Sequence, residues 1–173
     1  MIRMLFAALG LVILEVLYSL VGARMVYYFV PLLALQASAL VGLLLGPAKA
    51  SWWGALTGFL EDVYFISSNG AIGLSSIVYL WVGWVAGKLF YERADADNPA
   101  MGAVATAFAL ALGLVLAKIL SLVFNVALPA FSSMLTWTRV FSLAAQIALG
   151  PWMLRLMAWI LQPRNSSRHE AFQ

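Results

Sequence analysis

The sequence predicts an all-α integral membrane protein, a compact bundle of six transmembrane helices. The chain of 173 residues is 64% hydrophobic and only 10% charged, whereas a soluble domain carries about 25% charged residues. Its apolar stretches approach the ~20 residues that a helix needs to cross a ~30 Å hydrocarbon core. The gaps between these stretches are too short to fold alone, so one domain is expected.

Each apolar stretch predicts one membrane-spanning helix. The six stretches are residues 4–21, 26–45, 52–67, 71–90, 100–125 and 137–161. We therefore divide the chain into a transmembrane domain, residues 1–163, and a polar cytoplasmic tail, residues 164–173. The first stretch is longer than the apolar core of a typical signal peptide and contains Glu15, so it is interpreted as a retained first helix.

Glycine and proline mark the breaks between the predicted helices. Gly46 followed by Pro47 predicts the end of the second helix, because a proline just beyond a glycine cap cannot continue it. Asn98 followed by Pro99 predicts the start of the fifth helix, since asparagine caps a helix and proline suits its first turn. Residues 67–70, Ser-Ser-Asn-Gly, form a predicted polar turn.

The basic residues of the short loops set the expected orientation. With six spans, one side of the membrane holds Arg3, Lys49, Lys88, Arg93, Arg155, Arg164 and Arg168. The other side holds Arg24 and Arg139. This asymmetry predicts that both termini are cytoplasmic. An inner aromatic belt is then expected from Trp52, Trp53, Trp84 and Trp159.

Two adjacent carboxylates within the third stretch are the most informative feature. Glu61 and Asp62 lie in an apolar span, beside a stripe of small residues that includes Gly54 and Gly58. Charge at membrane depth is costly, so such side chains normally face protein or water. Glycines let a second helix approach closely. The pattern predicts a buried contact face, either between helices of the bundle or with a partner.

Further Gly-x-x-x-Gly pairs predict close helix contacts elsewhere. Gly83 and Gly87 form one pair in the fourth stretch, and Gly42 and Gly46 form another in the second. Most such pairs in apolar helices serve packing inside the bundle.

The carboxylates admit three roles: packing anchors within the bundle, contacts for a partner or ligand, or a proton relay. Arg155 lies in the sixth span, and its depth from the cytoplasmic edge of the membrane is similar to that of Glu61 and Asp62. It is therefore expected to pair with one of these two carboxylates. Lys118 lies near the outer end of the fifth span, where Glu15 is its best partner. As an alternative, Lys118 and Arg155 snorkel to the nearest interface.

The sequence contains no pattern typical of an enzyme, a cofactor site or a metal site. There is no cysteine, and the single histidine, His169, lies in the polar tail. Neither a phosphate-binding loop nor a nucleophile elbow occurs. The net charge of +3 is not gathered into a nucleic-acid patch. We expect a non-enzymatic protein without cofactor, metal or nucleic-acid partner.

The central part of the chain resembles MreD, the small membrane protein of the bacterial rod-shape system. The matching residues are Gly54-x3-Gly58-x3-Asp62, then Gly70-x2-Gly73, then Tyr79, and Gly83-x3-Gly87. They cover residues 54–87, about a fifth of the chain. Length, number of spans and the short basic tail are also similar, and Glu61 beside Asp62 is a variation on the pattern.

This resemblance implies a scaffold role in cell-wall elongation. MreD-like proteins are multi-pass proteins of the bacterial inner membrane, and they bind MreC, a single-span protein with an extracytoplasmic domain. They belong to the complex that links MreB filaments to RodA and its penicillin-binding transpeptidase during lateral peptidoglycan synthesis, and so control cell shape. Homo-oligomerisation stays open.

A second resemblance supplies an alternative. The expected bundle is similar to the S components of energy-coupling-factor transporters, which bind vitamin-like small molecules. Such a site needs several convergent polar groups. The candidates are sparse, and they are Gln36, Ser38, Asn69, Asn125 and Thr136.

Overall fold

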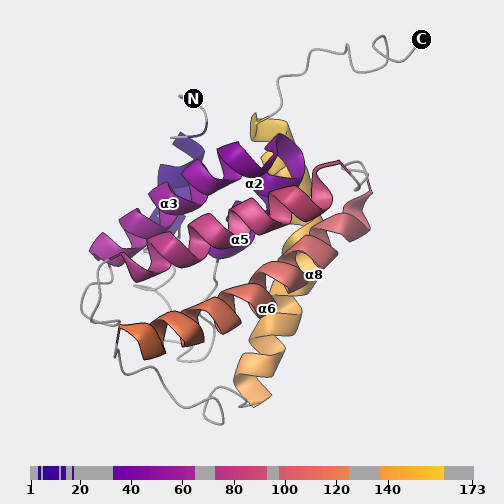
Figure 1. Cartoon of the computed structure of the whole chain (residues 1–173). Helices are drawn as coiled ribbons and strands as arrows, with labels where there is room; N and C mark the ends of the chain where they lie inside the picture. Colours follow the sequence, from indigo (N-terminus) through magenta and orange to yellow (C-terminus); the bar gives the residue numbers. More distant parts are fainter. Residues whose placement is uncertain are drawn as a thin grey trace.

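The computed structural model describes residues 4, 6–11, 13, 14, 17, 33–64, 73–92, 98–124 and 137–161. Five long helices account for most of these residues (Figure 1). They are α2 (Leu33–Leu45), α3 (Pro47–Tyr64), α5 (Leu74–Phe90), α6 (Pro99–Val123) and α8 (Trp137–Leu161). The described residues from 4 to 17 are helical as well, and no strand occurs within the described ranges. The predicted all-α class is therefore confirmed for this part of the chain.

The predicted starts of two helices agree with the structure. α6 begins at Pro99, and the side chain of Asn98 accepts a hydrogen bond of 3.0 Å from the backbone N–H of Ala100. This bond satisfies one of the amides that a helix start leaves without an intrahelical partner. α8 covers the predicted range, 137–161, and continues through Pro151.

The third helix starts earlier than its apolar stretch suggested. α2 ends at Leu45, and Gly46 has the left-handed φ of +87° that glycine adopts readily. Pro47 then opens α3, five residues before the predicted position 52, because its fixed φ suits a first helical turn. The connection between α2 and α3 is thus a single residue, and Lys49 lies on the helix.

α2 is the central helix of the bundle. Every residue from Leu33 to Leu44 is buried, and α2 contacts α3, α5, α6 and α8. One apolar cluster includes Leu40, Trp53 and Leu154, and a second includes Leu35 and Val82. Trp53 is only 1% exposed, so its predicted place in a surface aromatic belt is wrong.

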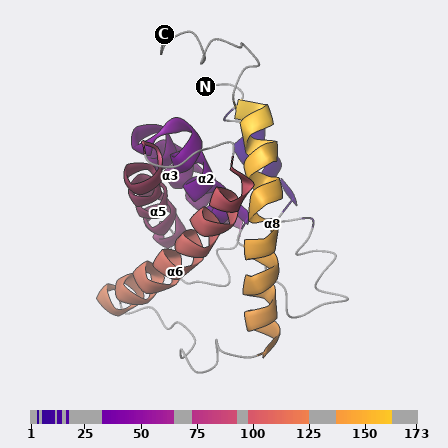
Figure 2. The same ribbon diagram turned by 90° about the vertical axis from the view of Figure 1, so that its right-hand side faces the viewer.

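The other helices pack around α2 in two pairs. α3 lies along α5, and α6 crosses α8 (Figure 2). The crossing of α6 and α8 is close because it occurs at two glycines. A methyl group added at Gly102 would lie 2.5 Å from the carbonyl oxygen of Gly150. Neither glycine belongs to a Gly-x-x-x-Gly pair, the pattern that predicted the other close contacts.

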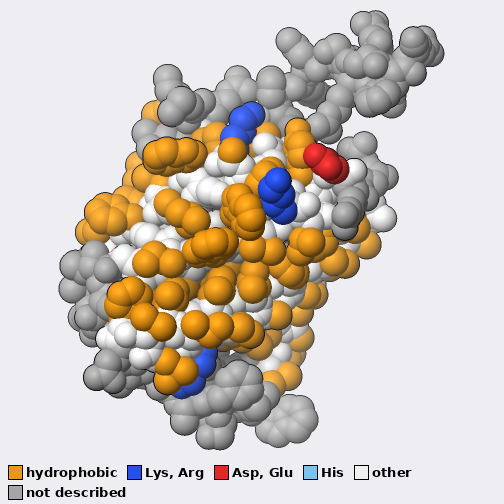
Figure 3. Space-filling view, in the orientation of Figure 1, with side chains coloured by type: hydrophobic (Ala, Val, Ile, Leu, Met, Phe, Trp, Pro, Cys, Tyr) orange, Lys and Arg blue, Asp and Glu red, His pale blue; other side chains and the backbone are white. Residues whose placement is uncertain are grey.

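Among the described residues, two helices have the length and composition to cross a membrane. They are α6, and α8 from Val140 to Leu161. Only 28% of the most apolar window of each is buried inside the protein, so both helices present apolar side chains outward. Figure 3 shows apolar side chains over most of the visible face, with basic side chains towards its upper and lower ends.

The α6–α8 crossing yields the first testable prediction. Gly102→Ala should lower the thermal unfolding temperature in detergent, because its methyl group meets backbone atoms that cannot move aside, and overpacking costs about 1–3 kcal/mol. Gly10→Ala is the matched control, since a methyl group there meets nothing within 4 Å and alanine favours helix. Equal unfolding temperatures for the two variants would contradict this packing.

Candidate functional site

The glycines of α3 face the backbone of α5. A methyl group at Gly54 would overlap the carbonyl oxygen of Tyr79, and one at Gly58 would lie 2.5 Å from the carbonyl carbon of Ser75. Both glycines are buried. The main chains of the two helices are therefore in contact. A residue larger than glycine at either position would not permit so short a distance between the helices.

The glycines of α5 extend this contact towards the other end of the helix. A methyl group at Gly83 would lie 2.7 Å from the carbonyl oxygen of Ala50, and one at Gly87 would lie 2.5 Å from Cα of Pro47. The central helix joins at the same place, because a methyl group at Gly42 would lie 2.8 Å from the carbonyl oxygen of Gly83. α5 is thus held between α2 and α3.

Asp62 joins the last turn of α3 to the first turn of α5. One carboxylate oxygen, Oδ2, accepts hydrogen bonds from the N–H groups of Gly73 at 2.8 Å and Ser76 at 3.3 Å. The other, Oδ1, accepts one from the N–H of Ser75 at 3.3 Å. Asp62 is 5% exposed. It therefore acts as an N-cap supplied by the preceding helix.

The antiparallel arrangement explains why a carboxylate is stable there. The first N–H groups of a helix lack intrahelical partners, and the N-terminal end of the helix dipole is positive. The cap residue of α5, Gly73, has no side chain to satisfy these amides and a φ of +99° that favours glycine. Asp62 satisfies the amides from outside and places its negative charge at the favourable end of α5.

Glu61 makes a separate contact with α5. Its Oε2 accepts a hydrogen bond of 2.6 Å from the hydroxyl group of Tyr79. Tyr79 is 4% exposed, and its carbonyl oxygen is the atom that Gly54 approaches. The two neighbouring carboxylates therefore bind different parts of the same helix, and both strengthen the α3–α5 contact.

The predicted pairing of Arg155 with Glu61 or Asp62 is wrong. Arg155 is exposed on α8, and α3 and α8 do not pack along each other. The hydrogen bonds of Asp62 go to backbone amides instead. The pairing was expected because the residues lie at similar depths in the predicted spans. Similar depth does not bring two side chains together unless their helices are neighbours.

The second predicted pair joins Lys118 to Glu15. Lys118 is exposed on α6. Glu15, its expected partner, lies outside the described residues, so this pair stays a prediction.

The structure assigns the site residues to contacts between helices rather than to a free surface. We refer to Gly54, Gly58, Glu61, Asp62, Gly83 and Gly87 as the α3–α5 interface. Its glycines are covered by backbone from α5, α3 or α2. A partner helix therefore has no access to them in this arrangement. The hydrogen bonds of Asp62 suit an anchor better than a proton relay, because both oxygens already accept bonds from fixed amides.

A second polar group, missed as a cluster by the sequence analysis, lies between α2, α6 and α8. The side-chain amide of Gln36 donates to Thr106 Oγ1 at 3.1 Å and to the carbonyl oxygen of Gln146 at 3.4 Å. Gln146 in turn donates to Ser142 Oγ at 3.2 Å. All four residues are buried. Gln36 is separated in the sequence from Thr106 by 70 residues and from Gln146 by 110 residues. No local sequence pattern could therefore predict this cluster.

Among the described residues, no group of three or more histidine, cysteine, aspartate or glutamate side chains could hold a metal ion. Comparison with protein families, with curated proteins and with solved structures finds no match for the chain.

The cap by Asp62 yields the second prediction. Asp62→Ala should lower the free energy of unfolding by about 1–3 kcal/mol, because buried amides of α5 lose a charged acceptor. Asp62→Asn should lose less. Its amide oxygen, placed where Oδ2 lies, can still accept from Gly73 and Ser76, and only the bond from Ser75 is lost. The measurement is thermal or denaturant unfolding in detergent.

Two comparisons control this prediction. Glu61→Gln should be milder than either Asp62 variant, since glutamine can still accept the bond from Tyr79. Arg155→Gln combined with Asp62→Asn should give the sum of the two single effects, as expected for residues without a shared contact. A strongly non-additive double variant would contradict the contacts described for Asp62.

Proposed function

We propose that the chain is a non-enzymatic scaffold of the bacterial rod-shape complex, which binds MreC and supports lateral peptidoglycan synthesis and cell shape. One observation carries the proposal: residues of the MreD-like motif meet in a single contact. Gly54 lies against Tyr79, and Asp62 binds the N–H of Gly73. Of the three remaining described glycines of the motif, Gly58 lies against Ser75 of α5, and Gly83 and Gly87 lie against the first turn of α3. Gly70 lies outside the described residues.

This convergence gives the spacing of the motif a physical meaning. The small residues let α3 and α5 touch, and the carboxylate closes the end of the contact. Glycine pairs commonly serve packing between helices, so the more specific part of this convergence is the bond between Asp62 and the N–H of Gly73. The motif therefore supports a particular helical hairpin, and this hairpin is the feature that we associate with the scaffold function.

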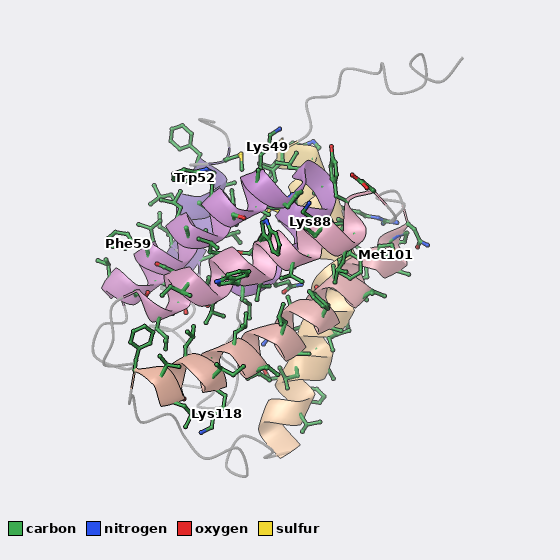
Figure 4. The ribbon with its side chains drawn as sticks, viewed as in Figure 1. Lys49, Trp52, Phe59, Lys88, Met101 and Lys118 are labelled. Atoms are coloured by element: carbon green, nitrogen blue, oxygen red, sulfur yellow. The ribbon has the colours of Figure 1, made fainter. Side chains whose placement is uncertain are left out.

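The proposed location is the bacterial inner membrane, with six spans and both termini in the cytoplasm. The outward-facing apolar surfaces of α6 and α8 support a position in the bilayer. The lysines support the orientation. Lys49 and Lys88 lie towards one end of the bundle, and Lys118 lies at the other (Figure 4).

The partner surface is proposed to lie outside the α3–α5 interface. MreC has one membrane span, which would pack against an exposed helix face. α2 is enclosed by other helices, whereas α6 and α8 expose large apolar side chains such as Val115, Leu122 and Phe141. The hairpin would then act indirectly, by holding the bundle in the shape that the partner recognises. MreB, RodA and its penicillin-binding transpeptidase would join through the assembled complex.

The topology can be tested by cysteine labelling, because the chain contains no cysteine of its own. We predict that Lys118→Cys reacts with a membrane-impermeant maleimide in intact spheroplasts. Lys88→Cys should react only after the membrane is permeabilised. The reverse pattern would overturn the orientation, and equal labelling of both positions in intact spheroplasts would contradict a membrane-spanning arrangement.

The scaffold function is tested by co-purification. The tagged chain, solubilised in a gentle detergent, should retain co-expressed MreC. Gly54→Leu should lose most of it because the larger side chain separates α3 from α5, and it should fail to restore rod shape. Gly10→Leu, the same substitution where a side chain meets open space, should behave as the unmodified chain. Absence of MreC from the unmodified chain would refute the proposal.

The alternative, an S component that binds a vitamin-like molecule, is favoured by one observation. Gln36 is fully buried, and its Oε1 has no hydrogen-bond partner among the described residues. Such an oxygen could accept a bond from a small polar ligand or a water molecule. The two functions differ in what accompanies the purified chain. A bound small molecule without MreC would favour the transporter, and a Gln36→Leu variant should then lose that molecule.

A further inference from the structure

We propose that the end of the bundle formed by the start of α3 and the end of α5 binds the headgroup of an anionic phospholipid. The binding residues are Lys49 and Lys88, flanked by Trp52 and Trp84. This inference goes beyond the scaffold function. It requires a bilayer around the chain, and it does not depend on MreC.

The packing of α3 on α5 brings the two lysines to the same end. Gly83 lies against Ala50, and Gly87 lies against Pro47, so the start of α3 is level with the last turns of α5. Lys49 follows Pro47 by two residues, and Lys88 directly follows Gly87. Both side chains are exposed, and both are seen on the same face of the molecule (Figure 4).

Within the described part of the chain, no carboxylate is paired with either lysine. Lys49 lies in the first turn of α3, which has no acidic residue, and there a positive charge opposes the helix dipole. Lys88 lies in the last turn of α5, where the dipole is favourable. The nearest described carboxylate in the sequence is Glu92, which is exposed beyond the end of α5, four residues after Lys88.

Exposed tryptophans place the lysines at headgroup depth. Trp52 follows Lys49 by three residues and Trp84 precedes Lys88 by four, so each ring lies on the same side of its helix as the lysine. Their exposed fractions are 79% and 40%. At 1.5 Å per residue, the rings lie about 4–6 Å deeper than the lysines. Tryptophan prefers the boundary between headgroups and hydrocarbon, so the lysines reach the phosphate layer.

The chemistry favours a lipid with net negative charge. Each ammonium group offers three donors to phosphate oxygens, and attraction of one lysine to an anionic surface contributes about fivefold in affinity. Two lysines at the same end of the bundle would give about a twentyfold to thirtyfold preference over a zwitterionic lipid. The close backbone contact of α3 and α5 fixes the helix positions from which the two lysines extend.

Native mass spectrometry of the full chain tests this proposal. The protein is exchanged into nanodiscs that contain equal amounts of phosphatidylglycerol and phosphatidylcholine, and the lipids that stay bound after release are counted. The unmodified chain should retain phosphatidylglycerol preferentially. The double variant Lys49→Gln with Lys88→Gln should lose about tenfold or more of this retention. Lys118→Gln, an exposed lysine at the other end of the bundle, should retain it, and Glu92→Gln should strengthen it.

Three results would overturn the site. The first is equal retention of phosphatidylglycerol by the double variant and the unmodified chain. The second is a loss of retention in Lys118→Gln as large as that in the double variant. The third is displacement of the lipid by millimolar inorganic phosphate alone, which would indicate a soluble anion as the ligand. Unfolding temperatures of all variants are compared first. If the double variant unfolds earlier, Lys49→Arg with Lys88→Arg, which keeps the charge, should restore retention, and failure to do so counts against the proposal.

Discussion

The main-chain contact between α3 and α5 is the constraint on which the rest of the described bundle depends. It requires glycine at four positions, and it encloses α5 between α3 and the buried helix α2. Close contact and hydrogen bonds both stabilise a helix pair. This contact supplies both, through Gly54 and Gly58 along its length and Asp62 at its end. α6 and α8 repeat the principle at Gly102 and Gly150.

Local signals in the sequence predicted the helices well where capping residues were decisive. Asn98 caps the start of α6, and Gly46 ends α2 in a left-handed conformation, as the prolines that follow them predicted. The Gly-x-x-x-Gly pairs and the carboxylates were recognised as a contact face, because small and charged residues in an apolar span have few other uses. What the sequence did not reveal was the partner of each residue. Asp62 binds backbone amides, which carry no residue-specific signal, and not Arg155.

Local sequence patterns also could not predict which residues of distant segments come into contact. Gln36, Thr106 and Gln146 come from three helices, and each taken alone is an ordinary polar residue in an apolar run. Trp53 shows the same limit. Its sequence neighbour Trp52 is exposed, but Trp53 points into the core one helical step away. Periodicity separates two such neighbours only when the buried side of the helix is already known.

The carboxylate in the α3–α5 interface is best understood as the solution to a backbone problem. Wherever a helix begins away from water, its first amides need acceptors, and each unsatisfied group costs several kcal/mol in an apolar medium. A carboxylate in the same medium is costly as well. At Asp62 the two costs offset each other. Its oxygens accept hydrogen bonds from three N–H groups at the start of α5 that have no partner within the helix. A neutral side chain would satisfy fewer of them. The fold of the hairpin itself therefore accounts for a carboxylate at this position.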